Sequence, residues 1–569
     1  MKQSHYREIT PAGLVLGVFQ GIVMTMAFTY AGLKLGFTMA GSTIAAILGF
    51  VFLKGILKKG TIVENNINQT VASAINISSA GIIFTFPALL LMGRPFPLLP
   101  IVLASVAGSF LGIMVIIPMR RQMIELDRLR FPTGTAVSTI LMAPGAGIQK
   151  AKLMFAGVFL SSVTVILIKV GILPGELKVG AWLHLPGYTN TVIALSLMNF
   201  GAGLLAGRPG LPLAVGGVLG WWVLSPVAHR AGWVAQLSSG SFYTALLRPL
   251  GIGVLIGGAL MGVVISLPAI KAALGSLSKM KGKGSSASAE ELPSRVLLWS
   301  IGLSLVVLFL ATYITAPRQG VLLSGAIAVV GTVWIALAGI IVAQCTGMTD
   351  MSPISGLALI AVTLILAMTH KHTVLAILVG TTVCVAISQC ADMMQDLKTG
   401  FLVGAHPRRQ QISQIAFAWI GPIVSIGTVL LLWHTSSGAP GFGPQSAACL
   451  HNAPGCLPAP QATALKAMVE SVIQGQAPVD RYLAGGLLGG VLSLVPGGSL
   501  GVLVGLAMYL PFSITLGYGL GCLANMFVVS KKGKGWFEDK GVPFAAGLIV
   551  GEALTELTFS FLIIVRSLN

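Results

Sequence analysis

Long apolar runs follow one another along almost the whole chain, and short segments with charged residues, glycine or proline separate them. Of the 569 residues, 55% are hydrophobic and 9% are charged. A soluble protein cannot bury that much apolar surface, so the pattern is that of a polytopic membrane protein. A membrane helix needs roughly 20 apolar residues, and some runs are shorter or broken. The chain therefore predicts an all-α fold of about sixteen transmembrane helices.

The basic residues indicate how the chain lies in the membrane. The formal net charge is +19, but these residues cluster in short loops, as the positive-inside rule expects. We therefore expect no nucleic-acid partner, and we expect the N-terminus in the cytoplasm. The apolar stretch that begins at Gly13 is predicted to be the first membrane helix rather than a cleavable signal peptide. The loops expected on the cytoplasmic side are 54–59, 120–130, 271–295, 398–409 and 531–540.

The longest polar connection, 434–481, carries one Lys and one Arg and is expected on the extracytoplasmic side. It contains Cys449 and Cys456, and an oxidising compartment would allow them to form a disulfide. Their spacing alone leaves that question open. The other four cysteines lie in apolar surroundings, where cysteine is usually a small core residue: Cys345, Cys384, Cys390 and Cys522.

A segment rich in Gly, Ser and Lys, 269–293, divides the chain near its middle. This composition predicts a flexible cytoplasmic loop between an N-terminal membrane half, 1–268, and a C-terminal half, 294–569. In each half an apolar run ends in lysines, and a charged loop then leads into a segment headed by proline. Two related halves with an internal repeat are therefore expected, as in many transporters.

Two apolar runs are interrupted by proline, glycine and polar residues, at 346–353 and at 495–499. Non-helical backbone at membrane depth is tolerated only inside protein or beside water, where it can bind substrate or ions. Asp350 in the first interruption and Pro496 in the second are therefore candidate positions in broken or re-entrant helices. An ordinary kink or loop is the alternative for both.

The segment 64–70 places a carboxylate and several amides between apolar runs. A carboxylate at the centre of a membrane helix costs roughly 2.5 to 3.5 kcal/mol, so it usually faces a bundle interior, a wet cavity or a partner. Read as a helix, the segment and its continuation carry four polar side chains on one face: Asn65, Gln69, Ser73 and Asn76. This stripe predicts contact with protons or substrate, and the alternative is hydrogen bonding between packed helices.

A second polar cluster follows an apolar run near position 390. On a helix, Asp392 and Asp396 lie one turn apart, and two ionised carboxylates at that spacing repel each other, which suits a carrier of protons. The alternative for Asp396 is an ion pair with Lys398 or Arg408 at a cytoplasmic helix end. Further polar residues are expected on the same face: Ser388, Gln395 and Thr399.

Glu552 and Glu556 form a third group, again four residues apart in an apolar segment. They are candidates for a proton relay, and structural hydrogen bonding is the alternative. His370 and His372 flank Lys371 in a short turn, which is more typical of a solvated loop than of a metal site. The sequence has no zinc-ligand spacing, phosphate-binding loop or nucleophile elbow, so we expect neither an enzyme nor a resident metal or cofactor.

Five segments together resemble the oligopeptide transporter (OPT) family in their order and spacing, most closely its yellow stripe-like and prokaryotic branch. They are ENNINQTVASA from Glu64, LRFPTGTA from Leu129, QCTGMTDMSPISG from Gln344, ADMMQDLKTGFLVGAHPRRQQ from Ala391 and AAGLIVGEAL from Ala545. The resemblance implies about sixteen helices in related halves. It also implies proton-coupled import of small peptides, glutathione-like compounds or metal chelates such as iron-siderophore complexes.

The family's acidic and amide motifs map onto this chain at Glu64, Asn65, Gln69, Asp392, Gln395 and Asp396. The Asp350 segment reads Met351-Ser352-Pro353 instead of the Asn-Pro form of peptide-transporting members, so the resemblance leaves peptides and metal chelates both open as substrates.

We expect a symporter of the inner membrane, and a channel for small polar solutes is the alternative. A homodimer is left open. The carboxylates expected to couple protons are Glu64, Asp392, Asp396, Glu552 and Glu556. The side chains expected to bind substrate are Asn65, Asn66, Gln69, Asn76, Gln344, Asp350, Gln395 and Lys398, and Lys34 is a further candidate to pair with charged groups of the substrate.

Overall fold

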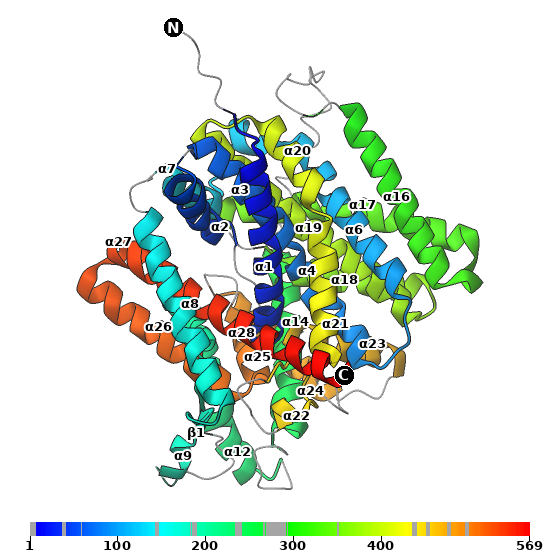
Figure 1. Ribbon diagram of the computed structural model, residues 1–569. Coiled ribbons are helices and arrows are strands. Elements are labelled where there is room, and N and C mark those ends of the chain that lie inside the picture. The colour runs from blue at the N-terminus through cyan, green and yellow to red at the C-terminus, as the bar shows by residue number, and fades with distance from the viewer. Residues whose placement is uncertain are drawn as a thin grey trace. The chain divides into compact units, whose positions relative to one another are not determined.

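The computed structural model is almost entirely helical (Figure 1), which confirms the predicted all-α class. In the part of the chain that is described, the exceptions are two antiparallel strands of two residues each, β1 (Glu176–Leu177) and β2 (Ile193–Ala194). The described residues are 7–36, 41–58, 60–142, 147–182, 184, 191–233, 242–265, 268, 292, 294–349, 352–434, 441–450, 456–474, 479–495 and 500–568.

Among these residues, twelve helices are long and apolar enough to cross a membrane, by length and composition. A multi-pass membrane protein is therefore confirmed, and the first of the twelve is the helix expected from Gly13 onward. The predicted total of sixteen crossings stays a prediction. Four shorter apolar helices also occur: Ser42–Ile56, Leu197–Ala206, Ile354–Met368 and Leu500–Tyr509.

The chain divides into two compact units, and each takes residues from both sides of the segment 269–293. Unit 1 is 1–29, 38–151 and 266–428, and unit 2 is 30–37, 152–265 and 429–569. The compact units therefore differ from the sequence halves 1–268 and 294–569, which remain a prediction about an internal repeat. Of the predicted loop between those halves, only Leu292 is a described residue.

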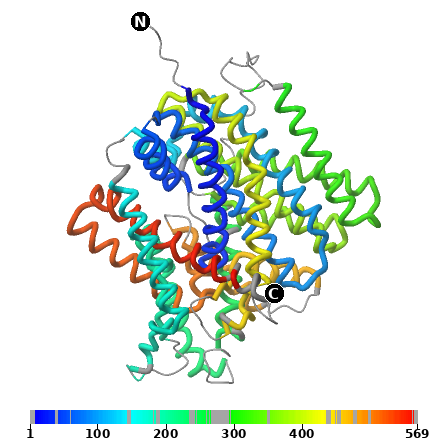
Figure 2. The backbone as a smooth tube through the Cα atoms, viewed as in Figure 1, coloured from blue at the N-terminus to red at the C-terminus, as the bar shows by residue number. Residues whose placement is uncertain are grey.

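The helices of unit 1, several of which are 3-10 or π turns (η), follow in chain order (Figure 2). They are α1 (Pro11–Leu35, whose last turns belong to unit 2), α2 (Ser42–Gly49), η1 (Phe50–Ile56), α3 (Ile62–Asn76), α4 (Ser78–Thr85), α5 (Pro87–Leu91), α6 (Leu98–Ile116), η2 (Ile117–Met119), η3 (Arg121–Leu126), α7 (Pro132–Met142), α16 (Ser294–Thr315), η8 (Pro317–Gln319), α17 (Gly320–Thr349), α18 (Ile354–Met368), α19 (Thr373–Val403) and α20 (Pro407–Phe417).

The division between the units also falls within α8 (Gly147–Lys169) and α21 (Ile420–His434). The remaining helices belong to unit 2. They are α9 (Val179–Trp182), α10 (Leu197–Ala206), η5 (Arg208–Gly210), α11 (Leu211–Val218), η6 (Leu219–Leu224), α12 (Ser225–Arg230), η7 (Tyr243–Leu247), α14 (Arg248–Ile265), α22 (Ala447–Leu450), α23 (Pro460–Gln474), α24 (Val479–Ser493), α25 (Leu500–Tyr509), α26 (Phe512–Lys532), α27 (Lys534–Trp536), η9 (Phe537–Gly541) and α28 (Val542–Leu568).

Helix α19 is the buried centre of unit 1, and glycines on its neighbours let the helices approach closely. A Cβ atom on Gly108 of α6 would lie 2.5 Å from the carbonyl oxygen of Thr382. A Cβ atom on Gly81 of α4 would lie 2.5 Å from the backbone nitrogen of Val385. These contacts leave no room for larger residues. The polar side chains of α19 must therefore find their partners on the helices that pack against it.

In unit 2, helix α10 packs against α26 and α28. A Cβ atom on Gly201 would lie 2.9 Å from the carbonyl oxygen of Ala545 on α28. The backbone of α10 thus runs close to α28, with no side chain between them at that point. This packing sets the start of α10 beside Glu552.

Three local predictions have an outcome in the structure. Helix α17 ends at Thr349 and α18 begins at Ile354, so the interruption of that apolar run is confirmed. Asp350 itself lies outside the described residues, as does Pro496. Cys449 and Cys456 form a disulfide. The four other cysteines are free and buried, which confirms their expected place in the core.

Candidate functional site

Helix α3 begins with a capping box that uses the most conspicuous carboxylate of the sequence. The Thr61 hydroxyl accepts a hydrogen bond of 3.1 Å from the backbone nitrogen of Glu64, and the Glu64 carboxylate accepts one from the backbone nitrogen of Thr61. Thr10 donates a further hydrogen bond of 2.5 Å to Glu64. These contacts are those of a helix cap and account for the buried carboxylate. The proton-coupling role of Glu64 stays a prediction.

The next two turns of α3 meet the carboxylates of α19, inside unit 1. Ser73 donates a hydrogen bond of 2.6 Å to Oδ1 of Asp392. Gln69 donates its amide to Oδ1 of Asp396. Both pairs are four residues apart on their helices, so one turn of α3 matches one turn of α19. All four side chains are buried. We call these residues the α3–α19 cluster.

The second oxygen of each carboxylate in the α3–α19 cluster has no protein partner among the described residues. Oδ2 of Asp392 and Oδ2 of Asp396 are buried, and neither accepts a hydrogen bond from that part of the chain. The side-chain oxygen of Gln69 is likewise buried and unpaired there. Leaving buried acceptors unpaired is costly, and such groups call for a specific explanation. Proton binding at the carboxylates is one that the chemistry supports.

The rest of the α3 stripe holds α3 to α2. Asn65 donates 2.9 Å to the carbonyl oxygen of Ala46, and the hydroxyl of Ser42 lies 2.8 Å from that of Ser73. The predicted stripe is thus divided between two neighbouring helices. Asn66 is fully buried, and neither atom of its amide has a partner among the described residues.

The polar side chains of α19 that were expected on one face point to different partners. Gln395 accepts 2.7 Å from the backbone nitrogen of Gly134 on α7, and Thr399 donates 2.9 Å to the carbonyl oxygen of the same residue. Ser388 donates to the carbonyl oxygen of Cys384 in its own helix. The contacts of Gln395 are therefore those of helix packing, and its role in substrate binding stays a prediction.

Gln410 on α20 completes the surroundings of the α3–α19 cluster. Its amide donates 3.0 Å to the hydroxyl of Thr70 and 2.9 Å to the carbonyl oxygen of Asp396. This residue was not among the predicted site residues. A signal was present, because Gln410, Gln411 and Gln414 form an amide-rich run after a basic loop. A run that polar is easily taken for a solvated surface, but all three side chains are buried.

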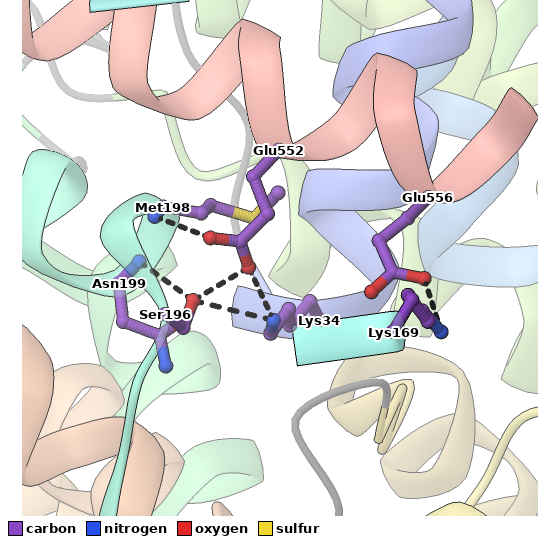
Figure 3. A network of polar contacts seen from close by, with 7 residues as sticks. All are labelled: Lys34, Lys169, Ser196, Met198, Asn199, Glu552 and Glu556. Atoms are coloured by element: carbon purple, nitrogen blue, oxygen red, sulfur yellow. Dashed lines mark hydrogen bonds and ion pairs between the residues drawn. The ribbon is translucent and has the colours of Figure 1, made fainter. Parts of the chain in front are cut away.

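Unit 2 holds a second buried polar network, around Glu552 of α28 (Figure 3). The ammonium group of Lys34, at the end of α1, donates 2.8 Å to Oε1 of Glu552. The Ser196 hydroxyl donates 2.6 Å to the same oxygen, and the backbone nitrogen of Met198 donates 2.9 Å to Oε2. We call these donors, together with Glu552, the carboxylate clamp. Their arrangement places a carboxylate at the N-terminus of α10, where the helix dipole favours negative charge.

Ser196 has two roles in the carboxylate clamp. It is the N-cap of α10, and its hydroxyl oxygen accepts 3.3 Å from the backbone nitrogen of Asn199. A Ser before an apolar run is a sequence signal for a helix start, so this residue was detectable although it was not predicted. What no local pattern indicates is its contact with Glu552, which is 356 residues away in the chain.

Glu556 lies in a different environment one turn further along α28 (Figure 3). Its carboxylate is 3.0 Å from the ammonium group of Lys169, and these side chains are 12% and 39% exposed. The side chains of Glu552 and Lys34 are only 5% and 2% exposed. The two glutamates therefore do not act as one pair, and their predicted proton-coupling roles remain predictions.

The other predicted site residues lie apart from these networks or outside the described chain. Asn76 is buried at the end of α3, and Gln344 is buried on α17. Lys398 is buried on α19, with its nitrogen 5.8 Å from the ring centre of Phe401. Their roles in substrate binding stay predictions, as does that of Asp350.

The turn that contains two histidines serves to start a helix. His372 is the N-cap of α19, and its Nδ1 accepts 3.3 Å from the backbone nitrogen of Leu375. Throughout the described residues, no three His, Cys, Asp or Glu side chains gather in a way that would hold a metal ion.

Comparison with known proteins places these features in a family. Residues 8–563 match the sequence profile of the family described as "OPT oligopeptide transporter protein". A Haemophilus influenzae protein named "Putative oligopeptide transporter" is 29% identical, and the alignment covers 94% of this chain and 92% of that protein. A Saccharomyces cerevisiae protein with the same description is 27% identical over 157 residues, which are 24% of this chain and 22% of that protein.

Proposed function

Because the chain belongs to the OPT oligopeptide transporter family, we propose that it is a proton-coupled symporter that imports oligopeptides or peptide-like compounds, metal chelates included, across the cytoplasmic membrane. Family membership was expected from the five sequence motifs and is confirmed. The names of both relatives support a peptide cargo. The assignment to the yellow stripe-like and prokaryotic branch remains a prediction.

The observation that carries proton coupling is the α3–α19 cluster. It contains two buried carboxylates, each with one oxygen hydrogen-bonded and one oxygen without a partner in the described chain. A charge in a low-dielectric interior is costly unless it is paired, and a proton removes that charge. The same proton turns an unpaired acceptor into a hydroxyl donor. We therefore assign the coupling proton to Asp392 and Asp396.

Gln69 and Ser73 give the cluster a way to report its protonation state to α3. Each donates to the carboxylate that faces it, and a hydrogen bond to a charged acceptor is stronger than one to a neutral acid. Protonation of Asp392 or Asp396 therefore weakens the hold of α19 on α3. A polar contact that changes strength with proton occupancy is what coupling to a conformational change requires.

Transport in proteoliposomes tests this proposal. The purified protein is reconstituted, an inward proton gradient is imposed, and uptake is measured for tri-alanine, glutathione and an iron-loaded chelator. A proton-coupled symporter accumulates its cargo above the external concentration, and a protonophore abolishes the accumulation. A pH-sensitive dye inside the vesicles should report proton entry only when the cargo is present.

The channel alternative gives a different result in the same vesicles. Flux through a channel only equalises the cargo concentration, whether or not a proton gradient is present. Uptake that stops at equilibrium under a full gradient would therefore overturn the proposal. Vesicles without protein provide the leak control, and the cargo that accumulates identifies the substrate class.

A further inference from the structure

We propose that the carboxylate clamp of unit 2 is a binding site for the carboxylate group of the transported substrate, and that Glu552 occupies it as an internal substitute while the site has no substrate. This inference deepens the proposed function and rests on it where it concerns the cargo. That the clamp itself accepts a foreign carboxylate stands on the geometry of unit 2 alone.

Three different kinds of donor meet at one carboxylate in this site (Figure 3). Lys34 provides an ammonium group at 2.8 Å, Ser196 a hydroxyl at 2.6 Å, and Met198 a backbone N–H at 2.9 Å. An ammonium, a hydroxyl and the free N–H of a helix N-terminus form a general donor set for binding carboxylates. Helix α28 contributes the carboxylate of Glu552 to this set and none of its donors.

The position of the clamp is that of a broken membrane helix. Helix α10 has ten residues, and at 1.5 Å per residue it is about 15 Å long, roughly half the thickness of a bilayer core. Half-length helices whose N-termini face anionic groups are typical substrate sites in transporters. Here the anionic group is supplied by the protein.

The donors are held in place by one another and not only by Glu552. The Lys34 ammonium lies 3.3 Å from the Ser196 hydroxyl, and the backbone nitrogen of Asn199 donates to the same hydroxyl. Removal of the Glu552 charge therefore leaves a preformed site with a buried cation. A buried cation that has lost its counter-ion is strongly destabilised, which favours entry of another carboxylate.

An unpaired amide adjoins the clamp in the first turn of α10. The side chain of Asn199 is fully buried, and neither its nitrogen nor its oxygen has a hydrogen-bond partner in the described chain. An amide can both donate and accept, which matches the C=O and N–H groups next to the terminal carboxylate of a peptide. This second observation favours a carboxylate that is part of a larger polar ligand.

Proton binding to Glu552 is the step that empties the clamp. Glu552 takes up one proton and leaves Lys34, and the substrate carboxylate forms the ion pair in its place. One proton and one negative charge thus enter the site together. The other ionisable groups near this exchange are Tyr30, whose ring centre lies 6.0 Å from the Lys34 nitrogen, and the ion pair of Glu556 with Lys169.

The chain offers a matched control in that second ion pair. Glu556 lies on the same helix, and like Glu552 it pairs with a lysine, but its partner Lys169 is 39% exposed. Within the described chain, Glu556 makes no hydrogen bond to a helix N-terminus or to a capping serine. A substitution at Glu556 therefore changes the same charge on the same helix without touching the clamp.

The first experiment uses acetate and does not depend on the cargo. Glu552→Ala removes the side-chain carboxylate, and acetate is small enough to replace it. The melting temperature of the purified full-length variant is measured in sodium acetate and in sodium chloride at equal concentration. We expect acetate to stabilise Glu552→Ala selectively, because a ligand that binds only the folded state raises its stability. Wild type and Glu556→Ala should not distinguish the two salts, and equal melting of Glu552→Ala in both salts overturns the inference.

The second experiment asks whether the carboxylate is that of a peptide. Binding of tri-alanine and of tri-alanine amide is measured for wild type, Glu552→Gln and Glu556→Gln. Glu552→Gln retains hydrogen-bonding capacity toward Ser196 and Met198 and so protects the fold. We expect its affinity for tri-alanine to rise about tenfold, because a neutral occupant competes less for Lys34, with no change for the amide. Glu556→Gln should behave as wild type.

The outcomes separate the two proposals. If both peptides bind wild type and Glu552→Gln with the same ratio of affinities, the inference is wrong and the transport proposal stands. If acetate stabilises Glu552→Ala but neither peptide binds any form, the clamp is a carboxylate site and a peptide cargo is excluded for the probes used.

Discussion

The hydroxyl of Ser73 on α3 donates a hydrogen bond of 2.6 Å to the carboxylate of Asp392 on α19. The two residues are 319 positions apart in the chain, and both are buried. One turn away, Gln69 and Asp396 repeat the arrangement. Two helices from distant parts of the sequence thus share a short polar seam in an otherwise apolar interior. The position of this seam depends on how closely the helices around α19 pack.

The packing around α19 depends on glycine. A Cβ atom on Gly112 of α6 would collide with the carbonyl oxygen of Ala386, so Gly112→Ala should push α6 away from α19. Such overpacking typically costs about 1 to 3 kcal/mol of stability. A Cβ atom on Gly325 of α17 would meet no atom within 4 Å, so Gly325→Ala is the control and should be neutral or stabilising by up to about 1 kcal/mol. Melting of the two purified variants tests this, and equal melting temperatures would contradict it.

The capping box of α3 sets where the polar stripe begins. Thr61→Ala removes the hydroxyl that accepts from the backbone nitrogen of Glu64, and loss of an N-cap costs about 1 kcal/mol. Thr61→Ser keeps the hydroxyl and is the matched control. We expect a lower melting temperature for the alanine variant only. An alanine variant as stable as the serine variant would mean that the cap contributes nothing to the fold.

Much of this architecture was predictable because it is written in local patterns. Apolar runs identify membrane helices, and the four-residue spacings of Gln69 with Ser73 and of Asp392 with Asp396 place each pair on one helix face. The cap was also readable, since Thr61-x-x-Glu64 has the spacing of a capping box. The cost of a carboxylate near lipid pointed more strongly to a functional role for Glu64 than this spacing did to a cap.

Partners between distant helices were not predictable. Lys34 and Glu552 are 518 residues apart, and neither residue's neighbours in the sequence indicate the other. The same holds for Gln410, whose contact with Thr70 spans 340 residues. A helix face can be read from one segment, but the helix that covers it depends on the packing of the whole unit. Sequence reasoning therefore identified candidate groups and missed which of them meet.

The disulfide between Cys449 and Cys456 predicts a simple labelling pattern. The protein has six cysteines, and four of them are free. Alkylation of the denatured protein without reductant should modify four cysteines, and reduction should expose all six. In Cys449→Ser all five remaining cysteines should react without reductant. Six modified cysteines before reduction would contradict the pairing and weaken the placement of this loop on the oxidising side.

Peptide exchange compared with peptide accumulation tests most directly that Asp392 and Asp396 carry the coupling proton. Asp396→Asn and Asp392→Asn keep the size of each side chain and abolish its proton binding. Glu64→Gln, which retains a capping side chain, is the control. In proteoliposomes, both asparagine variants should exchange internal for external tri-alanine but lose accumulation driven by a proton gradient, and the control should accumulate as wild type does. Full gradient-driven accumulation by either asparagine variant would contradict the account for that residue.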